Sequence, residues 1–412
     1  MSGSILGVRS AGDHAVLVEL AGLEEVLSLQ AKLAEHPLAG QLDVVAASST
    51  VLITADSTVR AKDIADQVRG LDLVTATRAD GKRVTIEAVY DGQDLEAVAD
   101  LTGLSRDAVV AAHTGQTWTA AFAGFAPGFA YLVGENHRLN VPRHSSPRTA
   151  VPAGSIALAG DYSAIYPRQS PGGWQLIGRT TAALWDIDRP DPALIRPGDR
   201  VRFGVVRELI NVNDAVRAAP PGDESAGGVT VTEPGMESTI QDLGRAGYAH
   251  LGVTSSGALD RGALRRANRL VGNPDEAAAI EVLYGGFAVW AVDDQVVSVT
   301  GAVTPLAIST PDGGIRHSDL ETPFVLHAGE QLELERPSSG LRNYVAVRGG
   351  VDVRQVLGSR STDTLSGIGP PPLVAGSRLA IGTPRAGSAV GNPESAPAQL
   401  TEFGVVAGPR DD

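Results

Sequence analysis

The 412-residue sequence contains no cysteine, few aromatic residues and no long apolar run. The lack of cysteine excludes disulfides, thiolate nucleophiles and cysteine-bound metals, and it fits a reducing compartment. Aromatic residues make up 4% of the chain, so aliphatic side chains must form most of the core. No apolar run reaches the roughly 20 residues that cross a bilayer, and the N-terminus lacks the pattern of a signal peptide. We therefore expect a soluble, cytoplasmic protein that does not enter a membrane.

Lysine is scarce as well, because it occurs only at Lys32, Lys62 and Lys82. Beyond these positions a Schiff-base lysine, a phosphate-loop lysine and the lysine of a Ser–Ser–Lys amidase are excluded. Arginine remains plentiful, and its planar guanidinium group binds carboxylates and phosphates. The net charge of −14 opposes contact with nucleic-acid phosphates, so no nucleic-acid partner is expected.

Common catalytic signatures are also absent. The sequence has no phosphate loop, no Gly-x-Ser-x-Gly elbow, no His-Glu-x-x-His and no dinucleotide-binding fingerprint. No two of the eight histidines have the i, i+4 spacing that places two metal ligands on one helix face. We therefore predict no metal site built by the protein's own side chains.

The chain divides by pattern into two modules joined by a linker. Strand-like segments at 15–20, 42–47 and 50–54 alternate with two amphipathic helices, the second capped by Ser57, so residues 1–83 predict a small α/β domain. Residues 84–208 consist mostly of short β-segments separated by Gly and Pro, which is typical of a β-barrel. Residues 209–228 have linker composition. Residues 229–412 again have mostly β-patterns, with one helix at about 259–271.

The predicted fold class is therefore mainly β with an α+β part, and residues 84–207 and 229–400 are each expected to form a mainly antiparallel barrel. Two short helices are predicted at 94–101 and 105–113, and their spacing through Gly103 also fits a helix-turn-helix. The second helix offers DNA only Arg106, offset by Asp107, whereas groove-binding helices need several cationic contacts. We interpret the pair as helices packed on the barrel.

Six dense segments of polar residues, Gly and Pro are the best candidates for a binding site. They cover residues 122–132, 141–148 and 166–180 in the first module, and 242–247, 252–260 and 358–363 in the second. Each also has a plain structural interpretation: Phe125 and Phe129 are more often core residues than a substrate platform, and a single arginine is more often a surface charge. Six such segments in one chain favour a functional interpretation.

These segments also carry a resemblance. The first module resembles the allophanate hydrolase subunit 1 family, which includes the 5-oxoprolinase B-subunit and sporulation-kinase inhibitors, in residues 124–132, 147–148 and 170–174. The second module resembles the allophanate hydrolase subunit 2 family, also called the 5-oxoprolinase C-subunit, in residues 241–247, 257–260, 347–350 and 358–363. Together the two resemblances cover nearly the whole chain.

The resemblance implies cyclophilin-like barrels and a ligand site where the two modules meet. It implies a component of an ATP-dependent 5-oxoprolinase that uses ATP, with Mg²⁺, to phosphorylate the lactam 5-oxo-L-proline for ring opening to L-glutamate with a separate hydrolase subunit. The alternatives are a carboxyltransferase module of urea carboxylase, for which biotin would be the cofactor, and a regulatory protein that inhibits a kinase. Homo-oligomer formation is left open.

Most predicted site residues lie in the six segments, and Asn268 and Arg348 lie in residues 267–268 and 347–350, which also carry the second resemblance. Catalytic acid, base or anion-stabilising roles are predicted for Asp242, Arg245, Asp260, Asp363 and His144. Substrate or anion binding is predicted for Phe125, Phe129, Arg143, Arg148, Arg168, Gln175, Asn268, Arg348, Arg360, Ser361 and Thr362.

The end of the sequence departs from the resemblance. Members of the subunit 2 family continue for roughly another barrel beyond the position where this chain ends. We therefore expect the second module to hold the first barrel only, and the chain to be inactive by itself. A lone strand candidate at 400–407 is expected to be poorly ordered or paired with its own barrel.

Overall fold

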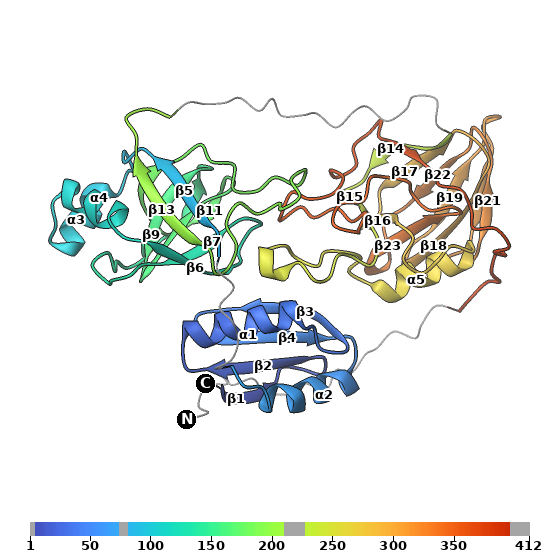
Figure 1. The fold of residues 1–412 in the computed structure, drawn as a ribbon. Coiled ribbons are helices and arrows are strands. Elements are labelled where there is room, and N and C mark those ends of the chain that lie inside the picture. Colours follow the sequence, from blue (N-terminus) through green and yellow to red (C-terminus); the bar gives the residue numbers. More distant parts are fainter. Residues whose placement is uncertain (1–4, 74–80, 210–226, 396–412) are drawn as a thin grey trace. The chain divides into compact units, whose positions relative to one another are not determined.

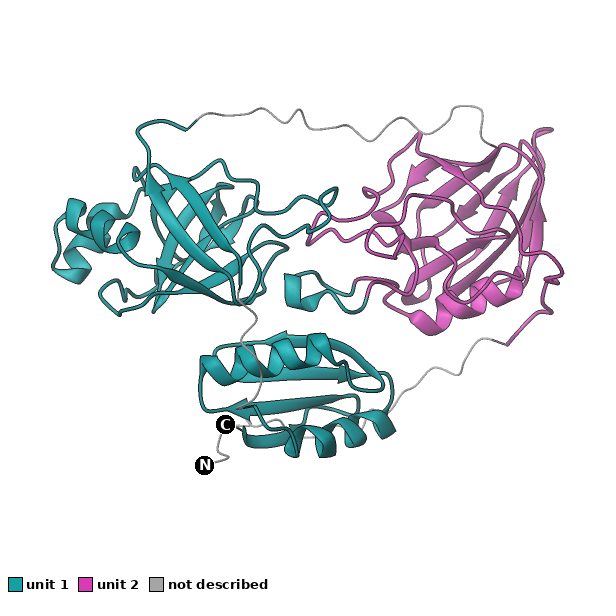
Figure 2. Cartoon of the chain, in the orientation of Figure 1, with its two compact units in different colours: residues 1–217, 246–255 teal, residues 218–245, 256–412 magenta. Residues whose placement is uncertain are grey.

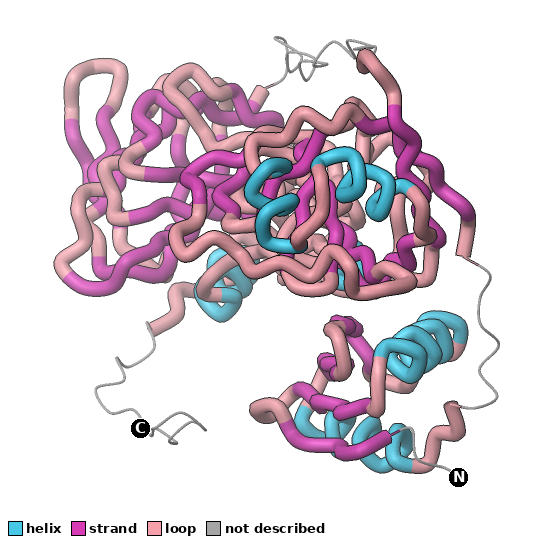
Figure 3. Tube along the Cα trace, turned by 90° about the vertical axis from the view of Figure 1, so that its left-hand side faces the viewer, coloured by secondary structure: helices cyan, strands magenta, loops and turns pink. Residues whose placement is uncertain are grey.

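The computed structural model describes residues 5–73, 81–209 and 227–395. Contacts divide the chain into unit 1, which comprises residues 1–217 and 246–255, and unit 2, which comprises residues 218–245 and 256–412 (Figure 2). Strands outnumber helices in both units, which confirms the predicted fold class. Figure 3 shows strands and helices along the chain in different colours. The predicted strand at 400–407 and most of the predicted linker lie outside the described residues.

Unit 1 begins with an antiparallel sheet of order β1-β2-β4-β3 and two helices (Figure 1). Alternate side chains of β2 and β4 are buried with the apolar faces of both helices, and Ser57 caps the second helix by accepting a hydrogen bond from the Arg60 N–H. The edge strand β1 was not predicted, because none of its residues is fully buried and its sequence lacks a clear alternation. The elements are β1 (Ile5–Ser10), β2 (Ala15–Leu20), α1 (Leu23–Glu35), β3 (Gln41–Ala46), β4 (Thr50–Ala55) and α2 (Thr58–Arg69).

A nearly closed sheet of order β12-β9-β10-β7-β6-β13-β5 follows. An isolated bridge between Val89 and Arg179 joins the end of β5 to β12. The strands are β5 (Arg83–Ala88), β6 (Trp118–Ala123), β7 (Ala130–Val133), β9 (Ser155–Ala159), β10 (Tyr162–Ile165), β12 (Gln175–Arg179) and β13 (Arg200–Val205), and a separate pair is formed by β8 (Arg148–Val151) and β11 (Ser170–Gly172). The pairing is antiparallel as predicted except between β5 and β13, which run parallel.

Two helices, α3 (Leu95–Thr102) and α4 (Arg106–Thr114), pack on this sheet. Leu95, Val98 and Val109 are buried in the same core as the barrel strands, which confirms their interpretation as barrel-packed helices. His113 of α4 is fully buried, and its ring nitrogens lie 2.7 Å from the Tyr90 hydroxyl and 2.9 Å from Ser163 Oγ.

Residues 246–255 complete unit 1. They include the 3-10 helix η1 (Ala249–Leu251), and the carboxylate of Asp43 accepts hydrogen bonds from the N–H groups of Gly247 (3.1 Å) and Ala249 (3.2 Å). The Gly128 N–H donates to the Leu251 carbonyl at 3.3 Å. This short segment is therefore hydrogen-bonded to residues more than a hundred positions away toward the N-terminus.

Unit 2 contains two antiparallel sheets of order β20-β19-β22-β17-β14-β24 and β15-β16-β23-β18-β21, which share one apolar core. The strands are β14 (Gly228–Pro234), β15 (Glu237–Gln241), β16 (Ala279–Leu283), β17 (Phe287–Ala291), β18 (Gln295–Val303), β19 (Leu306–Ser309), β20 (Ile315–Ser318), β21 (Phe324–Leu326), β22 (Gln331–Leu334), β23 (Ser339–Val347) and β24 (Arg378–Ala380). The predicted helix is α5 (Arg261–Leu270), and its apolar face is buried next to β18 and β23 as the pattern indicated.

In the described residues, no helix combines the length and the apolar character that crossing a bilayer requires.

Candidate functional site

Unpaired polar atoms mark two regions of the described chain. In the described residues, ten buried side-chain nitrogen or oxygen atoms have no hydrogen-bond partner. Seven of them belong to segments that the sequence singled out or to residues next to those segments. Because most buried polar atoms in folded proteins are paired, such atoms point to a ligand or solvent contact. We call residues 142–148 and 166–176 the unit 1 site, and residues 241–245 and 359–363 the unit 2 site.

Backbone contacts hold the unit 1 site together. The His144 N–H donates to the Gly173 carbonyl at 2.7 Å, and Gln175 Nε2 donates to the Pro142 carbonyl at 3.0 Å. Strands β8 and β11 add two further paired positions. Gly172 is required here, because a Cβ at this residue would clash with the Tyr166 hydroxyl. The two segments are thus fixed side by side, with the aromatic core of the barrel beneath them.

Asp94 is the central charge of the unit 1 site, and no sequence pattern indicated this role. Its carboxylate is buried and accepts hydrogen bonds from Arg148 Nη2 (2.7 Å) and the Leu176 N–H (2.7 Å). His144 Nε2 lies 3.3 Å from the same carboxylate, within ion-pair range but without hydrogen-bond alignment. Burial opposes ionisation, yet the Leu176 N–H, Arg148 and His144 outweigh it and hold the pKa of Asp94 below its usual value. Arg148 is therefore engaged by Asp94.

Other donors and acceptors of the unit 1 site have no protein partner in the described residues. These are Arg168 Nε, Ser170 Oγ and Gln175 Oε1, all buried. The exposed guanidinium group of Arg143 lies 5.6 Å from the ring centre of Trp174, a cation–π arrangement. A guanidinium group, an imidazole and a hydroxyl are the groups that bind a carboxylate or a phosphate.

The two predicted phenylalanines differ. Phe129 is fully buried among Tyr131, Tyr166 and Trp174, so it is a core residue. Phe125 is 53% exposed and has a φ of 68°, a conformation that a bulky residue adopts only under strain. Its ring contacts Phe129 edge-on, with the ring centres 5.2 Å apart. Strain and exposure together favour Phe125, and not Phe129, as a ligand-contacting residue.

In the unit 2 site, Asp242 is an organiser of the loop after residue 358. Its Oδ1 accepts hydrogen bonds from Ser359 Oγ (2.7 Å), Ser361 Oγ (2.5 Å) and the Gly244 N–H (2.7 Å), and its Oδ2 accepts one from the Arg360 N–H (2.6 Å). Four accepted bonds use about all the lone-pair positions of a carboxylate. Proton transfer by Asp242 would require breaking some of them, so these contacts support a positioning role and its catalytic role stays a prediction.

Arg245 carries a buried positive charge close to this loop. It is 2% exposed, and its Nη2 and Nε donate to the carbonyl oxygens of Ser361 (2.5 Å) and Val356 (3.3 Å). Burial lowers its pKa, while the charges of Asp363 and Asp242 act in the opposite direction. Nη1 has no partner among the described residues, and neither do Gln241 Oε1 and Thr362 Oγ1. A buried guanidinium group with an unused N–H is suited to bind an anion.

The remaining predicted residues of unit 2 have structural contacts. Asp260 caps α5 through the Ala263 N–H (2.9 Å), and Asn268 is fully buried and donates to the Ala277 carbonyl (2.8 Å). Arg348 donates to the carbonyl of Val271 (2.8 Å), and Arg360 to that of Val353 (2.9 Å). Asp363 accepts a bond from the Ser366 N–H at 2.8 Å. Each side chain is used for local structure, and a role in binding stays a prediction.

Sequence reasoning also missed a buried network at the start of α5. Glu281 accepts hydrogen bonds from the Tyr344 hydroxyl (2.7 Å), the Leu259 N–H (2.9 Å) and Arg342 Nη1 (2.8 Å). The Tyr344 hydroxyl in turn accepts one from the Asp260 N–H at 2.7 Å. The contacts join strands β16 and β23 to the turn before α5, and no local sequence pattern signals them.

Comparisons with known proteins agree with the resemblance seen in the sequence. The family described as "Carboxyltransferase domain, subdomain C and D" matches residues 6–195, and "Carboxyltransferase domain, subdomain A and B" matches residues 251–412. The chain is 35% identical to the 5-oxoprolinase B-subunit of Escherichia coli O157:H7 over 201 residues, which are 47% of this chain and 92% of that relative. It is 41% identical to the 5-oxoprolinase C-subunit of Escherichia coli K12 over 139 residues, 34% of this chain and 43% of that relative.

Two further similarities show how much of this chain and of each relative is covered. The urea amidolyase of Lachancea kluyveri is 39% identical over 140 residues, 34% of this chain but 7% of that protein. The crystal structure of TTHA0988 is similar with a TM-score of 0.81 and 32% identity, covering 98% of this chain and 81% of that one. The chain thus spans nearly all of a B-subunit relative and less than half of a C-subunit relative. It belongs to the carboxyltransferase-domain family, with a part similar to the 5-oxoprolinase B-subunit followed by a part similar to the C-subunit.

Proposed function

We propose that this chain is a component of an ATP-dependent 5-oxoprolinase and works with a separate hydrolase subunit. The observation that carries the proposal is the presence, in one chain, of a part similar to the B-subunit and a part similar to the C-subunit of that enzyme. Four of the unpaired polar atoms support it, because Ser170, Gln241, Arg245 and Thr362 lie in segments on which the resemblance rests.

The proposed chemistry begins with the poor reactivity of a lactam. Transfer of the γ-phosphoryl group of ATP to the carbonyl oxygen of 5-oxo-L-proline releases ADP and makes the ring carbon electrophilic. Water adds to that carbon, and the C–N bond breaks as the nitrogen takes a proton, which leaves an acyl phosphate. A second water adds to the same carbon and expels phosphate, and the product is L-glutamate. The protein must hold two anions, the substrate carboxylate and the phosphoryl group, and must exclude other reactions.

The side chains of the two sites fit such anions. In the unit 1 site Arg143, Arg168 and Ser170 offer a cationic and hydroxyl-bearing surface, while Arg245 of the unit 2 site offers a buried N–H. In this proposal they bind and orient carboxylate or phosphate oxygens, and His144 beside Asp94 moves a proton. Bound ATP supplies the phosphoryl group. Among the described residues no three acidic or histidine side chains gather as a metal site, so Mg²⁺ in this proposal is held mainly by the phosphates of ATP.

The similarity to urea amidolyase favours a second candidate function. A carboxyltransferase module would move a carboxyl group between carboxybiotin and urea instead of a phosphoryl group from ATP. The two functions use different co-substrates, so one experiment separates them.

The test combines the purified chain with a 5-oxoprolinase hydrolase subunit and measures ADP release that depends on 5-oxo-L-proline. We expect no coupled ADP release from either protein alone and release from the mixture, accompanied by an equal amount of glutamate. Transfer of labelled carboxyl from carboxybiotin to urea, with no ADP release, would support the second function and contradict the first.

A further inference from the structure

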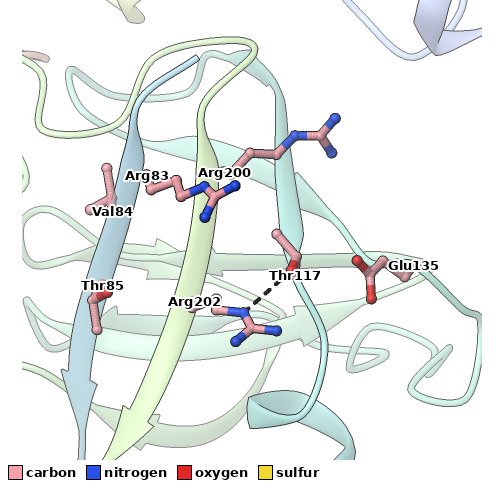
Figure 4. Close-up of a pocket in the computed structure, with 7 residues that line it drawn as sticks. All are labelled: Arg83, Val84, Thr85, Thr117, Glu135, Arg200 and Arg202. Carbon is pink, nitrogen blue, oxygen red and sulfur yellow. Dashed lines mark hydrogen bonds between the residues drawn. The ribbon is translucent and has the colours of Figure 1, made fainter. Parts of the chain in front are cut away.

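Strands β5 and β13 carry an arginine cluster that neither site uses. The two strands are parallel and in register, so Arg83 lies directly opposite Arg200, and Thr85 opposite Arg202. These residues alternate with the buried side chains of Val84, Val201 and their neighbours, which places them on the outer face of the barrel. Figure 4 shows the three arginines on that face, Arg83 on one strand and Arg200 and Arg202 on the next.

The cluster carries more positive than negative charge, because among the described carboxylates only that of Glu135 lines the same hollow as the three arginines. Like charges directly opposite each other on neighbouring strands destabilise a sheet. Arg200 donates to Thr119 Oγ1 and Arg202 to Thr117 Oγ1 (3.3 Å), both neutral partners, and neither these two arginines nor Arg83 forms an ion pair with a described carboxylate. The adjacent carboxylate of Asp199 instead accepts hydrogen bonds from the backbone N–H groups of Lys82 (3.0 Å) and Arg196 (2.8 Å).

Most other arginines of unit 1 are paired with a carboxylate. Arg179 pairs with Asp91 at 2.9 Å, Arg106 with Glu96 at 3.5 Å and Arg189 with Asp186 at 3.3 Å. In a chain with a net charge of −14, acidic partners are abundant. Like Arg143 and Arg168 of the unit 1 site, these three neighbouring arginines form no ion pair with a described carboxylate.

The three arginines line a hollow of about 560 Å³ together with Thr85, Thr117 and Glu135. That volume is within the range of small-molecule sites. The lining contains no aromatic ring and one apolar residue, Val84, so it offers nothing on which a nucleoside base could stack. Guanidinium and hydroxyl groups are donors for phosphate oxygens.

We propose that this hollow binds a small polyanion of the phosphate class, such as pyrophosphate or tripolyphosphate, through Arg83, Arg200 and Arg202. The bound anion supplies the missing negative charge between the paired strands. A nucleoside attached to the phosphates adds no affinity, because the lining recognises only the charged oxygens. This inference does not depend on the proposed 5-oxoprolinase function.

Calorimetric titration at low ionic strength tests the proposal. Pyrophosphate and tripolyphosphate should bind the wild-type protein and raise its melting temperature, whereas chloride at equal ionic strength should not. The Arg83→Gln/Arg200→Gln variant should bind each anion at least tenfold more weakly. Arg179→Gln is the matched control, since it removes an exposed arginine of the same barrel that is already paired, and it should bind like the wild type.

Two further results decide the class of ligand and guard against misfolding. Without added anion, Arg200→Gln alone should melt at a higher temperature than the wild type, because it removes a repulsion, and this readout requires no binding. The ATP binding that is lost in the Arg83→Gln/Arg200→Gln variant should be as tight as the tripolyphosphate binding that is lost, and this comparison excludes ATP bound at the unit 1 and unit 2 sites. Absence of binding to the wild type, equal weakening in the Arg179→Gln control, or a lost ATP site much tighter than the lost tripolyphosphate site would each overturn the proposal.

Discussion

The unit 1 and unit 2 sites balance their buried charges in different ways. In unit 1 the carboxylate of Asp94 is met by the guanidinium group of Arg148, and the site rests on a packed aromatic cluster. In unit 2 the carboxylate of Asp242 is met only by hydroxyl and backbone N–H groups, while the buried cation Arg245 is left with an unused N–H. The difference indicates that the Asp94–Arg148 pair of unit 1 serves mainly stability, and that Arg245 in unit 2 is available for a ligand.

The largest expected effect is a loss of unit 1 stability in acid. Burial lowers the pKa of His113 from 6.5 to about 3, so the unfolded chain binds more protons between these values. The stabilisation is present in full above pH 6.5 and is lost as the pH falls toward 3, by up to about 5 kcal/mol at 1.36 kcal/mol per pKa unit. Denaturant unfolding of unit 1 at a series of pH values measures it.

His113→Gln should flatten this pH dependence, whereas His36→Gln, at an exposed position, should leave it unchanged. A wild-type stability that stays constant from pH 7 to pH 4 would show that His113 does not dominate the acid response.

The aromatic part of the unit 1 site gives the next effect. Phe129→Ala should lower the free energy of unfolding by about 3–5 kcal/mol, because it empties a fully buried ring position. Phe125→Gly should change it by less than about 1 kcal/mol, since loss of contacts is offset by relief of the positive φ. Chemical denaturation of both variants makes the comparison. A large destabilisation by Phe125→Gly would place Phe125 in the core with Phe129.

Breaking the Asp94–Arg148 pair tests the unit 1 side of the comparison. Arg148→Met leaves Asp94 buried without its guanidinium partner, and we expect a loss of about 2 kcal/mol, less than for a fully buried pair because Arg148 is partly exposed. The pKa of Asp94 lies below its usual value, so this stabilisation is present above the usual carboxyl pKa and disappears in acid.

A double-mutant cycle with Asp94→Asn isolates the pair, because both single changes act on one interaction. Additive effects of the two substitutions would mean that the pair contributes nothing of its own.

Arg245→Ala tests the unit 2 side of the comparison. The expected change in free energy is the smallest of the series, and it is measured on the rate of the coupled reaction. If Arg245 binds a reacting anion, the coupled 5-oxoproline-dependent rate should fall more than tenfold, which corresponds to about 1.4 kcal/mol. Arg316→Ala is the control, because it removes an arginine of unit 2 that is already paired with Glu330. A rate near that of the wild type would assign Arg245 to structure only.

Local patterns predicted much of the fold. The period of apolar residues located α5 and the helices of the first domain, and Ser57 was identified as a cap because capping depends on residues three positions apart. The segments around residues 142–148 and 358–363 were singled out by composition, and the structure places unpaired polar atoms there or beside them.

The contacts that decide the roles of individual residues could not be predicted. Asp94 and Arg148 are 54 positions apart, and Glu281 and Tyr344 are 63 apart. The parallel pairing of β5 and β13, which brings Arg83 next to Arg200, joins strands separated by most of a domain. Such pairs depend on sheet topology, which the periodicity of a single strand does not encode. Asn268 and Arg348 show the same limit. Each lies in a stretch that carries the family resemblance, yet in the structure its side chain donates a hydrogen bond to a backbone carbonyl.

An isotope experiment tests the central claim most directly. The chain, a 5-oxoprolinase hydrolase subunit and ATP are incubated with 5-oxo-L-proline labelled with ¹⁸O at its ring carbonyl, and the released phosphate is analysed by mass spectrometry. Phosphorylation of the carbonyl oxygen predicts that the label appears in inorganic phosphate, in step with glutamate formation, and that Arg245→Ala slows its appearance. Glutamate formed with all of the ¹⁸O retained, or formed without ATP cleavage, would contradict the proposed activation.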